Sequence, residues 1–476
     1  MNLPDRPELM VIGDSLPQGC RSMTVTADFC RHSYSAQAAA LAKIPFQIPA
    51  HPRSVLIDLE QIASNLLEVG IPTVLGGFKS NLRAWLEDFA RPYQPGGPVP
   101  ECFDNLAVAG FTIEDTLGAA KQFDGTPGFG TARLAFDNFL RAQTAPGADV
   151  STGNLGDLHI ATNARYVLNP SNNPDYMDWS QVRWVAERQP KKLIVHVGHN
   201  NGLYRIGSRG LTGDWSKYWP SPGVATYLKL VSDLRASCPD THILVLGLPK
   251  VGAVSNLMPD SDRKIPGTDY FTRYKTMFPY QDPVDGTVVQ DADLSIADVN
   301  GQIRDGLRGI RDTDFYDVYR FFETLDTKNG VATAKKITVP YDGDDDHDPR
   351  NFVLDNNYIS CVIQNPGQYG EISAVFADGG LQSIDGMHPS SVAYALLGLI
   401  IGTRLWGIAP TDAEKIAFIK NVVKDELLLI DFPYDLDLLR GIINTFGRSG
   451  NAGSTDTRAL AAQNIAAMSG ALLNSD

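Results

Sequence analysis

The chain has 476 residues, enough for one large domain or for two to three ordinary ones. Hydrophobic residues make up 43% of it and charged residues 20%, which is typical of a globular protein with a packed core. The formal net charge is −14 and no long basic run is present, so the surface would repel phosphate backbones and we expect no nucleic-acid partner.

Several short apolar runs are typical of buried strands in a parallel sheet, because both faces of such strands are covered. Two helical patterns are clear between them, at residues 34–43 and 225–236. The predicted strands are Leu9–Ile12, Leu106–Ala109, Leu193–Val197, Ile243–Leu246 and Phe315–Tyr319. The alternation of strand and helix predicts an α/β protein, a three-layer α/β/α sandwich. Its sheet is expected to be doubly wound, mainly parallel, five-stranded and flavodoxin-like.

The distances between the predicted strands are larger than a minimal domain needs, since a crossover takes only a dozen residues or so. We therefore expect one large domain over residues 1–408, followed by a helical C-terminal extension over residues 409–476 that packs on the core or trails from it. Insertions that form lids or walls above the sheet are expected near residues 46–100, 121–190, 203–222 and 326–383. The segment NFVLDNNYISCVIQ within the last of these alternates like a hairpin.

The first strand runs directly into Gly13, Asp14 and Ser15. Glycine lets the chain turn sharply where the strand ends, and the Ser15 hydroxyl then points into open space beside its own amide. The same residue types are ordinary turn formers. By itself the segment predicts either a plain turn or a nucleophile at the rim of a sheet.

Two further strands end at residues suited to stabilising negative charge. The second predicted strand finishes at Gly110, where the absence of a Cβ lets a backbone N–H approach a ligand. The third runs into Asn200, whose side chain offers a neutral N–H donor. A strand-ending turn at Gly110 and an Asx-turn at Asn200 are the alternatives. We expect His196 to be a packed core histidine and assign no role to His199.

The fourth segment is DGMHP, with Asp385 three residues before His388. Within one turn this spacing lets the carboxylate accept a hydrogen bond from Nδ1–H of the imidazole. Such a bond fixes the tautomer and leaves Nε2 able to take a proton from a hydroxyl. The alternative is an aspartate that caps the helix predicted over residues 391–406.

In this order, Ser15, Gly110, Asn200 and the Asp385–His388 pair resemble the four sequence blocks of the SGNH or GDSL hydrolase superfamily, a group of serine esterases and lipases. The resemblance covers these blocks and the sheet between them. Asn201 stands where the family often has aspartate.

The resemblance implies that Ser15 is the nucleophile, that His388 is the general base, and that Asp385 orients His388. It further implies an oxyanion hole formed by the amides of Ser15 and Gly110 and the side chain of Asn200. No metal or organic cofactor is implied.

By this resemblance the chain is an esterase or lipase that cleaves carboxylic esters through an acyl-enzyme. Its substrate is expected to be a small-molecule ester or an acylated carbohydrate or lipid. The aromatic residues Trp215, Tyr218 and Trp219 would form the wall of an acyl pocket or stack on a sugar ring. The alternatives are a carbohydrate O-deacetylase, an acyltransferase, and a non-catalytic binding protein that keeps the fold.

The sequence predicts no transmembrane segment. Met1 to Glu8 is charged and proline-rich and predicts no signal peptide, so the compartment is cytoplasmic if Met1 is native and exported if a leader has been removed. The longest apolar run, residues 391–408, is predicted to be a buried helix rather than a transmembrane one. The five cysteines are expected to be reduced, with a Cys20–Cys30 bridge as the alternative in an exported protein.

Overall fold

We analysed a computed structural model of the chain. It describes residues 6–56, 58, 60, 84, 100–144, 152–203, 219–276, 284–332, 334–342, 349–357, 360–364 and 373–425.

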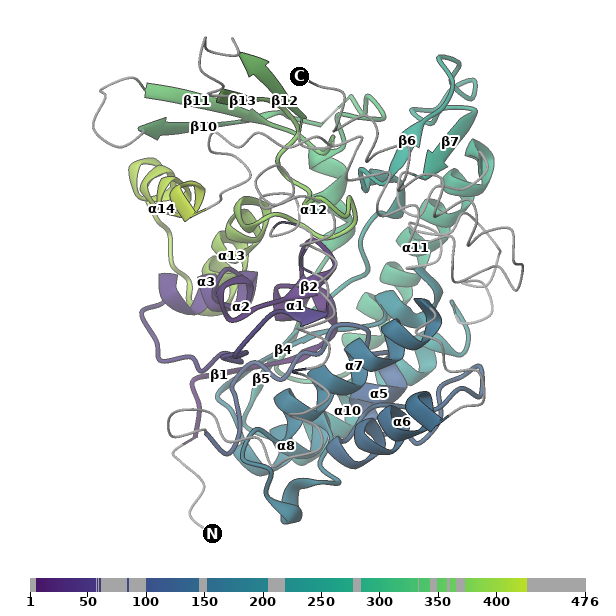
Figure 1. Cartoon of the computed structure of the whole chain (residues 1–476), viewed down its shortest axis with the longest axis vertical. Helices are drawn as coiled ribbons and strands as arrows, with labels where there is room; N and C mark the ends of the chain where they lie inside the picture. The colour runs from purple at the N-terminus through teal and green to yellow at the C-terminus, as the bar shows by residue number, and fades with distance from the viewer. Residues whose placement is uncertain are drawn as a thin grey trace.

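The centre of the molecule is a parallel sheet of four strands in the order β1–β4–β5–β9 (Figure 1). The strands are β1 (Leu9–Gly13), β4 (Lys192–His196), β5 (His242–Leu246) and β9 (Thr313–Tyr316). The α/β class and the parallel sheet are confirmed. The five-stranded, flavodoxin-like arrangement stays a prediction.

The predicted strand at residues 106–109 is not a regular strand in the structure. Residues 104–108 nevertheless run parallel to β1 and are joined to it by three backbone hydrogen bonds, from Val11 to Asp104, from Leu106 to Val11 and from Val108 to Gly13. The Asn105 side chain accepts a hydrogen bond from the amide two residues later at 3.1 Å. A local side-chain bond of this kind competes with the regular ladder, which explains the short pairing.

The strand predicted at residues 315–319 ends earlier than expected. Strand β9 ends at Tyr316, and helix α12 (Val318–Leu325) follows after one residue. The buried residues of this helix recur at helical spacing: Val318, Tyr319, Phe321, Phe322 and Leu325. That periodicity overrides the strand propensity of the aromatic residues.

Alternate residues of each strand enter different cores, because successive side chains point to opposite faces of a sheet. One core takes Met10, Ile12, Leu193, Val195, Ile243 and Val245. The other takes Leu9, Val11, Ile194, Leu244 and Leu246. Each residue in both sets is fully buried, so both faces of the sheet are covered.

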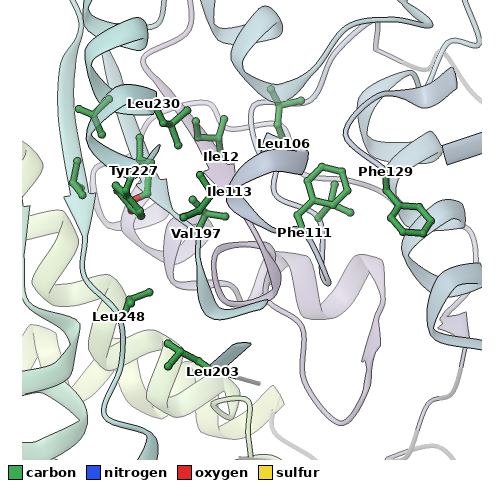
Figure 2. Close-up of a cluster of buried hydrophobic side chains, with 14 of the residues drawn as sticks. Ile12, Leu106, Phe111, Ile113, Phe129, Val197, Leu203, Tyr227, Leu230 and Leu248 are labelled. Atoms are coloured by element: carbon green, nitrogen blue, oxygen red, sulfur yellow. The ribbon is translucent and has the colours of Figure 1, made fainter. Parts of the chain in front are cut away.

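The first core lies under the helices that appear below and to the right of the sheet in Figure 1. They are α5 (Ile113–Leu117), α6 (Ala132–Thr144), α7 (Thr152–Leu168), α8 (Gln181–Arg188), α10 (Gly223–Ser237) and α11 (Gly286–Leu307). Figure 2 shows part of this core, where Ile12 of β1 and Leu106 pack with residues of α5 and α10. Helices α7 and α8, within a predicted insertion, therefore contribute to the main core.

The second core is covered by α3 (Tyr34–Leu41), α12, α13 (Ser391–Trp406) and α14 (Asp412–Asp425). The predicted helix over residues 391–406 is confirmed, and it packs along α3. Among the described residues, no helix combines the length and the hydropathy that crossing a bilayer would require. Residues 426–476 of the predicted extension lie outside the described residues.

The remaining strands form small antiparallel sheets, with the following bounds: β2 (Thr24–Val25), β3 (Val55–Leu56), β6 (Leu257–Pro259), β7 (Arg273–Thr276), β8 (Val284–Asp285), β10 (Ile337–Asp342), β11 (Pro349–Leu354), β12 (Ser360–Gln364) and β13 (Ser373–Asp378). The hairpin expected within residues 351–364 is wrong in its pairing. Strand β11 pairs with β10, and β12 pairs with β13.

Lys328 ties the segment after α12 to the loop that follows β5. Its ammonium group donates to the carbonyls of Gly252, Val254 and Leu257 at 2.9, 2.6 and 2.6 Å. Burial lowers the pKa of Lys328 to about 8. The same loop supports the turn that carries His388, because the amide of Asn256 donates to the carbonyl of Gly386 at 2.8 Å.

We expect Lys328→Ala to lower the free energy of unfolding by about 3 kcal/mol, because three carbonyls lose a charged donor. Lys335→Ala, at an exposed lysine of the same segment, should stay within about 0.5 kcal/mol of the wild type. Urea unfolding measures both. Equal stability of the two variants would show that these carbonyls do not depend on Lys328.

Candidate active site

Ser15 lies at the carboxyl end of β1, at the first residue of the short helix α1 (Ser15–Gln18). The turn before it requires glycine: Gly13 has φ +142°, and a Cβ there would lie 1.9 Å from the carbonyl oxygen of His196. Ser15 is 8% exposed. Among the described residues, none forms a hydrogen bond with its hydroxyl.

Two buried glutamines hold the segment before Gly110 against β1 and α1. Gln181 accepts from the amide of Gly13 at 3.0 Å and donates to the carbonyls of Gly13 and Leu106 at 2.9 and 2.7 Å. Gln18 accepts from the amide of Ala109 at 2.7 Å. These bonds bring the first and second sequence blocks together at one edge of the sheet.

Gly110 itself lies in a turn with φ +95°. A Cβ at this position would lie 2.4 Å from Cγ1 of Ile160 on α7. Glycine is therefore needed both for the backbone conformation and for the close approach of α7.

The third block joins the same edge through its two asparagines, in the turn His199–Leu203. Asn200 donates from Nδ2 to the carbonyl of Phe111 at 2.9 Å. Asn201 accepts from the amide of Ile113 at 3.0 Å and donates to Glu114 at 2.8 Å. Asn200 is therefore anchored one residue away from Gly110, and its amide nitrogen carries a second N–H.

Asp385 and His388 form the direct contact that their spacing predicts. Oδ2 of Asp385 lies 2.7 Å from Nδ1 of His388. Oδ1 accepts from the amides of Met387 and His388, both at 2.8 Å, and from the Ser383 hydroxyl at 3.1 Å. Burial would raise the pKa of Asp385, but His388 and these donors outweigh it and lower the pKa to about 2.

The pKa of His388 moves in the opposite direction. Burial by itself would lower it, but the adjacent side chains of Cys20 and Asp385 raise it well above its ordinary value of 6.5. The imidazole side chain is 12% exposed, whereas Asp385 is fully buried. The pair is thus a shielded carboxylate beside a partly open imidazole.

The loop after α1 connects the Ser15 end of the site to the Asp385–His388 turn. The amide of Cys20 donates to the carbonyl of Ser15 at 3.0 Å, and the amide of Met23 donates to Oδ2 of Asp385 at 2.9 Å. The structure therefore joins Asp385 to His388 directly. Ser15 is linked to both of them through residues 20–23, and within the described residues no hydrogen bond joins it to His388.

Two further histidines and two cysteines near the site are buried. His196 is fully buried and its Nδ1 lies 2.9 Å from the Tyr34 hydroxyl, so the prediction of a core histidine is confirmed. His199 contacts Asp14, a pairing that the sequence did not predict. Cys20 and Cys30 are both free buried thiols.

The aromatic wall predicted around residue 215 is only partly described. Trp215 and Tyr218 lie outside the described residues. Trp219 is 1% exposed, so its ring does not offer an open stacking face. No group of three or more His, Cys, Asp or Glu residues that would suit a metal ion is found in the described part of the chain.

Sequence reasoning missed Gln18, Gln181 and Asn163, whose side chains form buried hydrogen bonds that support the site. Gln18 and Asn163 exchange two amide hydrogen bonds of 2.9 and 2.8 Å, and both are fully buried. No local pattern marks these residues, because their partners lie between 75 and 168 residues away in the chain.

Comparisons with known proteins add little to this geometry. No family model and no curated protein matches the chain. One solved structure with a match is described as "Peptidoglycan O-acetylesterase in action, 5 min", at a TM-score of 0.22 and 13% identity. The match covers 48% of this chain and 42% of that one. A likeness of this size supports no conclusion about function.

We expect Gln18→Ala to lower the free energy of unfolding by about 3 kcal/mol, because the buried amides of Ala109 and Asn163 lose their partner. Chemical denaturation measures the change. Gln302→Ala, at an exposed glutamine of α11, is the matched control and should change stability by less than about 0.5 kcal/mol. A Gln18 variant as stable as this control would contradict the proposed support.

Proposed function

We propose that the chain is a serine hydrolase that cleaves carboxylic esters, with Ser15 as the nucleophile, His388 as the base and Asp385 as the residue that orients it. The observation that carries the proposal is the 2.7 Å contact between Oδ2 of Asp385 and Nδ1 of His388. It lies beside the loop after α1, in which the amide of Cys20 donates to the carbonyl of Ser15.

Asp385 prepares His388 for proton transfer. With a pKa of about 2 the carboxylate is ionised at neutral pH, and its fixed position selects the tautomer with the proton on Nδ1. Nε2 then carries the lone pair that accepts the hydroxyl proton. The raised pKa of His388 makes it a stronger base and stabilises the imidazolium formed in the reaction.

Ser15 suits the role of nucleophile because its hydroxyl has no competing partner among the described residues and lies at the carboxyl edge of a parallel sheet, where ligands bind in α/β folds. Catalytic hydrogen bonds are often long in a ligand-free enzyme and tighten when substrate binds. A Ser15–His388 bond in the substrate complex is therefore part of the proposal.

The oxyanion that forms on the substrate carbonyl needs hydrogen-bond donors at the same edge. We assign this role to the amides of Ser15 and Gly110 and to Nδ2 of Asn200. The Ser15 amide belongs to the first turn of α1, where amides have no acceptor within the helix. Asn200 is anchored to Phe111, next to Gly110, which supports the grouping.

In the reaction, Oγ of Ser15 attacks the ester carbonyl while Nε2 of His388 takes its proton. The tetrahedral intermediate collapses and His388 returns the proton to the departing alcohol, which leaves an acyl-enzyme. Water, activated by the same imidazole, then releases the acid. A carbohydrate O-deacetylase would use the same steps, and an acyltransferase would replace water by another acceptor.

We expect a fluorophosphonate probe to add once to the wild-type protein, at Ser15, because the probe reacts with activated serines. Ser15→Ala should take up no probe. Ser237→Ala, at an exposed serine of α10, and Cys20→Ala, next to His388, should both be labelled. Intact-protein mass spectrometry and peptide mapping give the readout.

An unlabelled wild type would contradict the proposal and favour a non-catalytic binding protein. Label at Cys20 instead of Ser15 would contradict the assignment of the nucleophile. Label at Ser15 without hydrolysis of p-nitrophenyl esters or acetylated sugars would favour the acyltransferase.

We expect the kcat/KM for p-nitrophenyl acetate to rise with pH through a midpoint above 6.5, because His388 acts as a base only when neutral and its pKa is raised. Cys20 and Asp385 both raise this pKa, and Asp385→Asn removes the contribution of Asp385, so the midpoint should move to lower pH. The kcat should fall by about 10,000-fold, the effect of the equivalent change in other triads.

The matched control for this profile is Asp298→Asn, at an exposed aspartate of α11, which should keep the wild-type rate and midpoint. An Asp385→Asn variant with the wild-type profile would contradict the role of Asp385.

A further inference from the structure

Asp14 lies between Gly13 and Ser15, and its carboxylate contacts a histidine of another turn instead of capping the helix that follows it. Asp14 is the N-cap of α1, and an aspartate in that position normally accepts a hydrogen bond from a backbone amide of the first helical turn. No such bond forms. Instead Oδ2 lies 2.6 Å from Nδ1 of His199 and accepts from the His199 amide at 3.3 Å. The pairing joins β1 to the turn after β4.

The turn that His199 begins carries the proposed oxyanion donor. Asn200 is the next residue, and its side chain reaches the carbonyl of Phe111, beside Gly110. A single carboxylate therefore fixes the start of the Asn200 turn relative to the residue that precedes Ser15. Three of the four sequence blocks meet around this contact.

The His199 ring is also held from its other side. It packs edge-on against His196, with ring centroids 4.6 Å apart and an interplanar angle of 79°. His196 is bonded in turn to the Tyr34 hydroxyl. Burial keeps the pKa of His196 well below its ordinary value, so this neighbour is neutral. The ring orientation of His199 is therefore set by both Asp14 and His196.

The pair is poorly suited to a purely stabilising role. Asp14 is fully buried and His199 is 8% exposed, yet Oδ1 of Asp14 and Nε2 of His199 have no hydrogen-bond partner among the described residues. Buried polar atoms without partners are unfavourable for folding, and a functional role is one of the reasons why native proteins keep them. An apolar contact would hold the two turns together at a smaller cost.

We propose that Asp14 and His199 are a positioning pair that sets the Asn200 side chain relative to Ser15. The proposal rests on the function proposed above, since it assumes that Ser15 attacks an ester and that Asn200 stabilises the oxyanion. Neither residue of the pair exchanges a proton with the substrate. Their effect is on the geometry of the oxyanion hole, so it should appear in kcat and leave KM unchanged.

Two amide substitutions at residue 199 separate positioning from proton transfer. The side-chain nitrogen of asparagine takes the place of Nδ1, and that of glutamine takes the place of Nε2. We expect His199→Asn to keep the bond to Asp14 and to stay within about threefold of the wild-type kcat. His199→Gln should lower kcat by about 10- to 100-fold, the size of effect that a small misplacement of a catalytic group produces.

A double-mutant cycle with Asn200 tests whether the pair acts through that residue. Asn200→Ala alone should lower kcat by about 100- to 1,000-fold. In that background His199→Gln should have no further effect. Asp14→Ala provides a second route if His199→Gln fails to fold, because Asp14 contributes no helix cap. It should lower kcat to the same extent as His199→Gln, and the combined variant should be no worse than either.

The outcomes are distinct. Equal activity of His199→Asn, His199→Gln and the wild type overturns the positioning pair, provided that Ser15→Ala abolishes hydrolysis. Retained activity in His199→Gln with loss in His199→Asn overturns it in favour of a direct role for Nε2. Additive losses in the Asn200→Ala background overturn it in favour of general destabilisation. A wild type that hydrolyses no ester and takes up no fluorophosphonate overturns the proposed function, and the pair with it.

Discussion

The arrangement of the site depends on the hydrogen bonds that the buried carboxylate of Asp385 accepts. It accepts hydrogen bonds from its own turn, from the imidazole of His388 and from the amide of Met23. An ionised carboxylate can be kept out of water only when donors surround it. Met23 follows α1 and His388 precedes α13. The hydrogen bonds of Asp385 therefore bring together two segments that are far apart in the chain.

The buried amide side chains of Gln18, Gln181 and Asn163 support the candidate site through hydrogen bonds. They are neutral, so they bind backbone groups and one another without the desolvation cost of buried charges. Gln181 and Asn163 come from α8 and α7, two helices within a segment that the spacing of the strands marked as an insertion. These helices cover one face of the sheet, and Gln181 of α8 also joins Leu106, in the segment before Gly110, to Gly13 of β1.

The Asp385–His388 and Asp14–His199 contacts differ in the hydrogen bonds that their carboxylates make. Asp385 has donors on both oxygens, and its partner imidazole is partly open to solvent. Among the described residues, Asp14 has one oxygen without a partner, and the side chain of its histidine is 11% exposed, about as much as that of His388. The first arrangement suits a base that exchanges protons with a ligand. The second suits a rigid link beneath the reacting groups.

The sequence by itself determined the α/β class, the strands β1, β4 and β5, the helix α13 and the Asp385–His388 contact. Each of these depends on residues close together in the chain: an apolar run, a helical periodicity, or two side chains in one turn. Only the tertiary structure decided how the segment around Leu106 joined β1 and which strand paired with β11. It also decided the partners of Gln18, Gln181 and His199. The physical reason is that buried polar groups must find hydrogen-bond partners wherever the fold brings them, and local sequence carries no record of partners that lie far away in the chain.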